Sequence, residues 1–418
     1  MQCLIRGATL ISAGTDHHER VADVHYADGR IVAIGTQLTR PEGEVELVEA
    51  TGCYLMPAFL DIGTQVREPG LEQHEDLESV SAAARIGGYG ALAPFPNTDP
   101  VVDGKTGVRF LQLAVQGLPV DFYPIGALTK GTAGEHPAEL IDMYRQGAVA
   151  FSDGTAPLRD DGQLLRALQY AQSFDGTIIY QPRHGQLQTD GQMHEGRVST
   201  SLGLRGMPAA AERTAVQRAI ELLRYGGGRL HLYAISSAAS LPLIAAAKAE
   251  GLALTASTTP LHLLLTDAAL TAFDSAYKMM PPLRLAADRD ALVEALVDGT
   301  LDCIVSNHAP WDGEHKNLEF QYAAFGVPTL ETAFSAARTA TQAQLPLPAL
   351  SALFSTGPAR VLGLPAPRLA VGEALALTLF DPRDTWTVGA SDLRSKGFAN
   401  PLTGSALSGK VRRVFRKV

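Results

Sequence analysis

One pattern dominates the sequence: between about Leu55 and Leu362, a short apolar run is followed repeatedly by a longer segment with helical periodicity. Such alternation is typical of α/β proteins in which each strand returns through a helix to a parallel neighbour. The runs are unbroken, as expected of strands that are buried on both faces. The candidate strands are Phe59 to Ile62, Ala91 to Phe95, Asp121 to Ile125, Ala148 to Ser152, Thr177 to Tyr180, Leu230 to Ile235, Ala253 to Ser257 and Cys303 to Ser306. Eight strands of this kind predict a (β/α)8 barrel.

The segments between the runs are rich in Ala and Leu at helical spacing. They predict helices over Leu164 to Gln172, Ala209 to Leu223, Ala238 to Ala249 and Arg289 to Val297. In a barrel of parallel strands, the reactive side chains lie at the carboxyl ends of the strands. Functional residues are therefore expected directly after the apolar runs, on the face that we call the barrel mouth.

Both ends of the chain read instead as short strands and tight turns. The predicted strands are Cys3 to Arg6, Ala8 to Ile11, Val21 to Tyr26 and Ile31 to Ile34 near the start, and Ala374 to Phe380, Trp386 to Val388 and Val411 to Val418 near the end. Asp28-Gly29 between two apolar runs is a strong hairpin signal. The basic residues of the last segment, Lys410, Arg412, Arg413, Arg416 and Lys417, alternate with apolar ones and predict a strand with one solvated face.

Composition excludes several classes of protein. With 35 Lys+Arg against 44 Asp+Glu, the formal net charge is −9, and no long basic block is present. Nucleic acids and anionic membranes need a concentrated positive field, so neither is expected as a partner. No run approaches the roughly 18 apolar residues of a membrane span. The sequence therefore predicts a soluble, cytoplasmic protein. Cys3, Cys53 and Cys303 form no CxxC pair, so neither disulfides nor a thiolate metal site is expected.

Four segments at predicted strand ends carry sequence motifs: 61–70 (DIGTQVREPG), 95–100 (FPNTDP), 151–154 (FSDG) and 306–311 (SNHAPW). They resemble the dihydroorotases of the amidohydrolase superfamily, in which these places read D-x-H-x-H-x-R-E-P-G, P-N-T-x-P, F-S-D and D-H-A-P. Further matches follow in the same order, at Met193 to Gly196, Pro208 to Glu212, Thr259 to Leu263, Pro281 to Arg284, Phe325-Gly326 and Leu330 to Thr332. The resemblance therefore covers nearly the whole chain.

The resemblance implies a TIM barrel of amidohydrolase type over residues 55–365. It also implies a small β-sandwich that residues 1–54 and 366–418 build together, which agrees with the strand-and-turn pattern of both chain ends.

The metal positions of the family are altered in this sequence. In the family, two histidines of the first strand, a fourth-strand Asp or carboxylated Lys, histidines after the fifth and sixth strands and an eighth-strand aspartate hold the metal and activate water. The matching residues here are Gly63, Gln65, Asp153, Pro182, Ala234 and Asn307. Zinc takes imidazole, thiolate or carboxylate ligands and needs about three from the protein, so Asp153 alone cannot hold it. We therefore expect no zinc, no other cofactor and no catalytic residue, since Asn307 cannot accept a proton as the family's aspartate does.

Three other histidines are candidates for replacement ligands. His184 lies two residues past Pro182, a shift of about 6–7 Å along a strand. His231 points to the opposite strand face from Ala234, and His262 matches a family position in a Thr-Pro-Leu-His segment. Structural or surface roles are favoured for all three, and a relocated metal site stays open as the less favoured alternative.

The resemblance also implies a residual anion-binding set, because Arg67, Asn97 and His308 match family residues that bind the substrate carboxylate. An arginine fork could still clamp a small anion. The family's asparagine before Pro-Pro-Leu-Arg is Met280 here, which removes one polar contact. The favoured alternative is a closed, inert mouth in which Asn97 caps a turn and Arg67 pairs with a carboxylate, that of Asp61, Glu68 or Asp153.

The motifs and the altered site residues are compatible with three functions. The favoured one is a non-catalytic dihydroorotase-like chain, similar to the bacterial type that associates with the catalytic chain of aspartate carbamoyltransferase in pyrimidine biosynthesis and forms a homo-oligomer within that larger complex. The alternative is an active dihydroorotase or related cyclic amide hydrolase with a displaced metal or none. The third is a metal-free sensor that binds an anion through Arg67 and Asn97.

Overall fold

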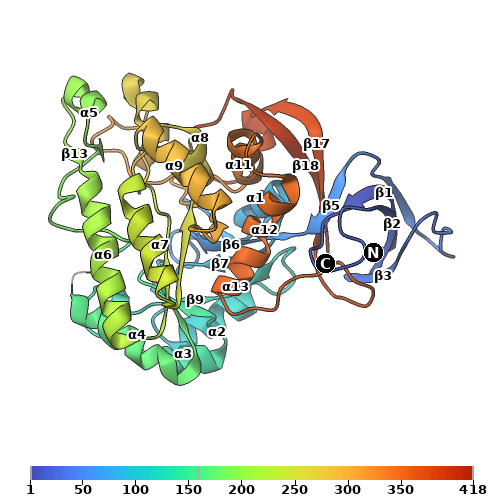
Figure 1. Ribbon diagram of the computed structural model, residues 1–418, viewed down its shortest axis with the longest axis horizontal. Helices are drawn as coiled ribbons and strands as arrows, with labels where there is room; N and C mark the ends of the chain where they lie inside the picture. Colours follow the sequence, from blue (N-terminus) through green and yellow to red (C-terminus); the bar gives the residue numbers. More distant parts are fainter. Residues whose placement is uncertain (1, 159, 417–418) are drawn as a thin grey trace.

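The computed structural model describes residues 2–158 and 160–416, and it contains the predicted barrel (Figure 1). All eight predicted strands are present, and neighbouring strands pair in parallel. They are β6 (Phe59–Thr64), β7 (Tyr89–Pro94), β8 (Asp121–Phe122) with β9 (Ile125–Gly126), β10 (Ala150–Phe151), β11 (Thr177–Tyr180), β14 (Arg229–Leu232), β15 (Leu254–Thr258) and β16 (Cys303–Ile304). The predicted fold class is thereby confirmed.

The third strand differs from the prediction because it is broken into two pieces. β8 pairs with β7, β9 pairs with β10, and Tyr123-Pro124 lies between them. Proline has no backbone N–H to donate, so a single continuous ladder across this position is not available. The barrel closes between its first and eighth strands, where Gln65 N donates to His308 O at 3.0 Å.

A buried carboxylate fastens that closure. Asp61 in β6 is fully buried and accepts hydrogen bonds from the backbone N and the Oγ of Ser306, both at 2.6 Å. Burial raises the pKa of Asp61. The aspartate of the first motif therefore joins strands and does not face the mouth as a free group.

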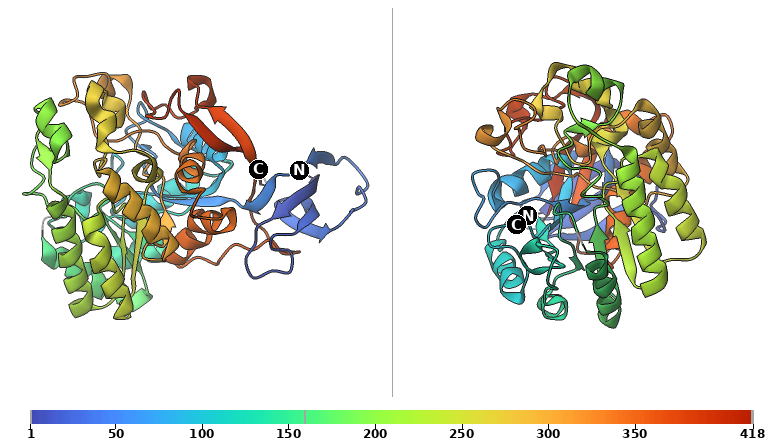
Figure 2. Two further views of the ribbon diagram at one scale, coloured as in Figure 1. Left: turned by 45° about the horizontal axis from the view of Figure 1, so that its top comes forward. Right: turned by 90° about the vertical axis from the view of Figure 1, so that its left-hand side faces the viewer.

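Helices surround the strands, and the four predicted ones are present with small changes at their ends (Figures 1 and 2). The helices are α1 (Leu77–Gly87), α2 (Lys105–Ala114), α3 (Leu140–Gln146), α4 (Asp161–Ala171), α5 (Arg197–Leu202), α6 (Ala209–Gly226), α7 (Leu241–Ala249), α8 (Pro260–Leu264), α9 (Ala286–Val297), α10 (Gly313–Lys316), α11 (Ala333–Thr341), α12 (Leu347–Phe354) and α13 (Thr356–Val361). Short 3-10 turns lie at Lys130–Thr132, Gln172–Phe174, Ala238–Ser240, Asp267–Ala272, Ser275–Tyr277 and Ala390–Asp392. α4 begins earlier than predicted because Asp160 caps it, accepting from Gly162 N at 2.8 Å.

The two chain ends form one seven-stranded sheet beside the barrel, as Figure 2 shows. Its strands are β1 (Gln2–Leu10), β2 (Val21–Ala27), β3 (Arg30–Gly35), β4 (Glu46–Glu49), β5 (Tyr54–Pro57), β17 (Leu377–Thr387) and β18 (Ala406–Phe415). β2 and β3 are the hairpin predicted around Asp28-Gly29. Lys417 and Val418, which the predicted terminal strand includes, lie outside the described residues.

The hairpin of β17 and β18 extends from this sheet onto the barrel. It packs against α1 and α11, and Gly409 O accepts from Ser335 Oγ at 2.8 Å and from Trp386 Nε1 at 3.1 Å. A short parallel pair of β12 (Met193–His194) and β13 (Gly206–Met207) lies apart from both sheets. No helix of the described residues is both long and apolar enough to cross a bilayer.

Candidate functional site

The centre of the barrel mouth is filled by aromatic rings at the position of the first family ligand. Gly63 is the last residue but one of β6 and has φ +84, and a Cβ atom there would lie 2.6 Å from Tyr233 Cε2 and 2.7 Å from two ring atoms of Phe95. Both rings are buried and meet edge to face with centroids 4.9 Å apart. Real Cβ atoms do not approach other atoms so closely, so only glycine fits at position 63 unless the rings move.

Asp153, the one retained carboxylate, already has its hydrogen-bond donors. Its Oδ1 accepts from Leu128 N and Thr129 N, both at 2.9 Å, and its Oδ2 accepts from Thr129 Oγ1 at 2.6 Å. Burial raises the pKa of this carboxyl. Asp153 therefore holds the loop after β9 in place.

The remaining family ligand positions offer amides or no side-chain donor. Gln65 Nε2 lies 3.5 Å from Thr155 Oγ1, and Asn307 Nδ2 donates to Met280 O at 3.2 Å. Pro182 and Ala234 are buried and carry no lone-pair donor in their side chains. A zinc ion needs about three imidazole, thiolate or carboxylate ligands, and these six positions supply one. The residues present do not fit the family's metal.

A small pocket remains at the mouth beside these positions, and its charged side chains are two arginines. We call it the mouth pocket; its volume is about 220 Å³, and it is lined by Gln65, Arg67, Thr155, Arg183, Met280, Asn307, Ala309, Trp311, Phe325 and Gly326. Arg183 donates to Thr155 O at 2.7 Å, and the Arg67 guanidinium lies over the Trp311 ring at 4.2 Å. The Nε atoms of both arginines are buried without a hydrogen-bond partner among the described residues.

Arg67 does not have the carboxylate partner that the sequence analysis favours. Instead of pairing with Asp61, Glu68 or Asp153, it stacks on Trp311, and the charge of Glu75 favours its cationic form. Burial lowers the pKa of Arg67 to about 10. The guanidinium thus stays charged at neutral pH, and an anion in the mouth pocket would meet two arginine side chains.

The other two residues of the predicted anion-binding set have different neighbours. His308 is fully buried; its Nε2 lies 3.3 Å from Glu75 Oε2, and its Nδ1 accepts from Thr329 N at 3.1 Å. Asn97 donates to Asp153 O at 3.1 Å and accepts from Thr155 N at 3.4 Å. The structure therefore does not bring Asn97 and His308 to the mouth pocket with Arg67.

The three candidate replacement histidines have hydrogen-bond partners other than the family's metal positions. His231 contacts Thr255 Oγ1 at 2.9 Å and Ser257 Oγ at 3.0 Å, and His262 Nε2 faces the carbonyls of Pro281 and Pro282 at 3.2 Å. Burial lowers the pKa of His231 to about 3 and that of His262 to about 4. His184 accepts from Leu187 N at 3.4 Å. None of the three reaches the family's metal position.

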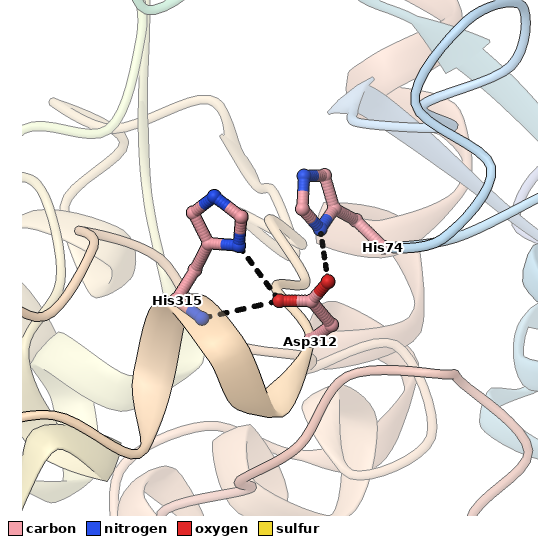
Figure 3. A group of neighbouring side chains, drawn as sticks. All are labelled: His74, Asp312 and His315. Atoms are coloured by element: carbon pink, nitrogen blue, oxygen red, sulfur yellow. Dashed lines mark hydrogen bonds and ion pairs between the residues drawn. The ribbon is translucent and has the colours of Figure 1, made fainter.

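One cluster was not predicted from the sequence: His74, Asp312 and His315 lie together (Figure 3). His74 lies in the loop after β6, and the other two lie at the start of α10, after β16. His315 Nδ1 is 2.8 Å from Asp312 Oδ1, and His74 Nδ1 is 3.3 Å from Asp312 Oδ2. The D-x-x-H spacing of Asp312 and His315 is a signal in the sequence, but His74 joins them only through the fold.

The chain is similar in sequence to several known proteins. The Dihydro-orotase-like family matches residues 52–240. A "Dihydroorotase" of Pelotomaculum thermopropionicum is 39% identical over 411 residues, which are 98% of this chain and 96% of that protein. A "Dihydroorotase-like protein" of Pseudomonas aeruginosa is 39% identical over 416 residues, 99% and 97% of the two chains.

Solved structures support the fold alone. The "L-Hydantoinase (Dihydropyrimidinase) from Arthrobacter aurescens" superimposes with a TM-score of 0.87 at 23% identity, over 99% of this chain and 94% of that one. A D-hydantoinase superimposes with a TM-score of 0.84 at 21% identity, over 100% of this chain and 94% of that one. Both are similar in the course of the chain, and their identity is too low to carry residue roles across.

Proposed function

We infer that this chain, which belongs to the dihydroorotase family of the amidohydrolase superfamily, is a non-catalytic member of it that serves pyrimidine biosynthesis as a structural subunit. Its task in this proposal is to support the catalytic chain of aspartate carbamoyltransferase. The barrel and the small sheet then persist because they build an assembly, and the mouth no longer needs a metal.

The observation that carries the proposal is the packing around Gly63. The space that a ligand side chain would occupy is taken by Phe95 and Tyr233, whose rings would lie 2.6–2.7 Å from a Cβ atom. Protein interiors are packed as densely as organic crystals, so moving these two rings to admit a side chain would destabilise the fold. Loss of the ligand is thus accompanied by loss of the room for one, which supports a role without the family's metal.

The proton acceptor is missing as well. Asn307 stands where the family has an aspartate, and its amide Nδ2 donates to Met280 O. A carboxamide has no ionised form that accepts a proton at neutral pH. A hydrolase of cyclic amides needs both an activated water and a base, and this site lacks residues for each.

An exposed apolar surface supports a structural partner. Large apolar side chains on neighbouring helices are 44–55% exposed: Phe110 and Leu113 on α2, Tyr144 on α3 and Tyr170 on α4. α2 and α3 are joined by hydrogen bonds between Gln112 and Gln146. Exposed apolar side chains often mark an interface, and we assign the exposed sides of these three helices, which we call the α2–α4 surface, to the transferase chain.

The first test is turnover. We expect the purified, untagged chain to show no cyclisation of carbamoyl aspartate above background, with or without added zinc, because no residue replaces the family's ligands and base. The enzymatic assay should include an active dihydroorotase at equal concentration as the positive control. Turnover by this chain that rises with bound zinc would refute the non-catalytic role.

The second test is the partner. We expect the chain to purify with the transferase catalytic chain from native cells under gentle conditions, with a complex mass that contains several copies of both. The double variant Phe110→Ser/Leu113→Ser should weaken this association at least tenfold, about 1.4 kcal/mol. Tyr225→Ser, at an 81% exposed position at the end of α6, is the matched control. A transferase that purifies without this chain would overturn the partner assignment and leave the inactivity untouched.

A second candidate, an active dihydroorotase or related hydrolase, is favoured by one observation. Relatives at 39% and 40% identity over more than nine-tenths of the chain are named "Dihydroorotase". Such an enzyme would need a displaced metal or none, since the family positions do not fit one. The turnover test above separates the two candidates directly.

A further inference from the structure

We propose that His74, Asp312 and His315 form a zinc site at the rim of the barrel mouth, away from the family's metal position. The inference goes beyond the proposed function, since it assigns a ligand to residues that take no part in it. It also revises the expectation that the chain binds no metal, which rested on the six family positions alone.

The distances between the three side chains are those of a coordination sphere. One ligand atom from each residue can be chosen so that all lie within 4.8 Å of one another. The two contacts to Asp312 are 2.8 Å from His315 Nδ1 and 3.3 Å from His74 Nδ1. With zinc–ligand bonds of about 2.0–2.1 Å, neighbouring ligand atoms of a tetrahedral site are about 3.3 Å apart. A small movement of exposed His315 completes that geometry.

The second observation is the state of His74. Its side chain is 2% exposed, and it points at the Asp312 carboxylate in Figure 3. Asp312 Oδ2, 3.3 Å away, is the one polar partner of Nδ1 among the described residues, and the contact is too poorly aligned to satisfy that atom fully. Buried polar atoms are almost always well satisfied, so a buried imidazole nitrogen in this long contact with a carboxylate is placed to share a cation with it.

The second nitrogen and the rings around it hold this imidazole in place. The ring meets Trp311 and His315 at centroid distances of 4.7 Å each, and the Gln73 amide lies beside it, with Gln73 Nε2 3.2 Å from His74 Nε2. A zinc ion on Nδ1 requires the proton on Nε2, so the Gln73 amide turns its oxygen to that N–H when the metal binds. His74 is thus preorganised, and His315, whose side chain is 47% exposed, provides the open side.

The donor set selects the metal. Two imidazoles and one carboxylate suit borderline divalent ions such as zinc, whereas calcium and magnesium prefer an all-oxygen shell. Three protein ligands leave a fourth position for water. The ion would join the loop after β6 to the loop after β16, the two strands between which the barrel closes.

The test uses the full-length, untagged chain, freed of metal and titrated with zinc chloride by calorimetry. We expect one zinc per chain, a higher Tm with zinc, and visible absorption bands of four-coordinate cobalt when cobalt replaces zinc. Asp312→Asn keeps the cap of α10, since asparagine caps helices as well as aspartate does, and it removes the charged ligand. Asp312→Asn and His315→Ala should each weaken zinc binding about 100-fold, while His136→Ala, at an exposed position outside the cluster, should leave it unchanged.

The outcomes separate this inference from the proposed function. Zinc bound at one per chain and lost in both variants supports the site, and a simultaneous lack of dihydroorotase turnover supports the proposed function too. Turnover that disappears in Asp312→Asn would keep the site and refute the non-catalytic role. No zinc binding, or binding that both variants retain, would overturn the site and leave the proposed function standing.

Discussion

Gly63→His is expected to destabilise the protein by about 4 kcal/mol or more instead of restoring a metal ligand. The same substitution at Gly251 is expected to cost only about 1 kcal/mol. The two glycines have nearly the same backbone conformation, with φ +84 and +83, but a Cβ at Gly251 has nothing within 4 Å. The strain of a left-handed residue is therefore common to both variants, and the difference measures the space taken by Phe95 and Tyr233.

The measurement is the midpoint of urea unfolding, compared among variants under one set of conditions. Gly63→Ala adds a smaller side chain and should fall between the wild type and Gly63→His, which keeps the comparison possible if the histidine variant fails to fold. Zinc content should stay unchanged in all three. If Gly63→His were as stable as Gly251→His, the aromatic rings would yield easily and the argument from packing would fail.

The Gly63 case also shows what the sequence could predict about the site. The replacement of a family histidine by glycine is visible in the sequence, and so is the loss of the other ligands. The sequence does not show that the space around position 63 is filled, because this depends on which side chains of the second and sixth strands point at it. Phe95 and Tyr233 are far apart in the chain, and only the register of the closed barrel brings them together.

The strands and helices were predictable for a simpler reason. Strands buried on both faces need unbroken apolar runs, and all eight runs became strands, while one broke at Pro124, where the backbone cannot donate. The partners of individual side chains were harder to predict from the sequence, since they depend on distances across the mouth. His308 was grouped with Arg67 from the motif, yet it faces Glu75, and His74 was not singled out at all.

Several family-like segments outside the mouth meet in one buried network, which gives them a structural reason. The Glu212 carboxylate accepts from Ser237 N at 2.9 Å and from Ser240 Oγ at 2.8 Å. Arg284 contacts His194 Nδ1 at 3.1 Å and donates to Met207 O at the same distance, and its NH2 lies 3.7 Å from Glu212 Oε2. Glu212, Arg284 and His194 come from three of the motifs and are all less than 5% exposed.

Glu212→Ala is therefore expected to destabilise the protein by about 3–5 kcal/mol, because it leaves the buried Arg284 cation and several donors without their acceptor. Glu221→Ala, on the same helix, should change stability by less than about 0.5 kcal/mol. Glu221 pairs with Arg224 at 2.6 Å, but its side chain is 62% exposed. Urea unfolding of both variants gives the comparison, with helix propensity nearly equal in the two.

The double variant Glu212→Ala/Arg284→Met tests the cause of that loss. Removing both charges takes away the uncompensated cation, so the double variant should be more stable than the sum of the two single losses predicts, by about 1–3 kcal/mol. Simple additivity would mean that packing and not charge sets the cost. Because Glu212, Arg284 and His194 share no hydrogen bond with His74, Asp312 or His315 among the described residues, their variants should leave zinc binding at that cluster unchanged wherever the chain is folded. Stability and metal content are therefore independent readouts.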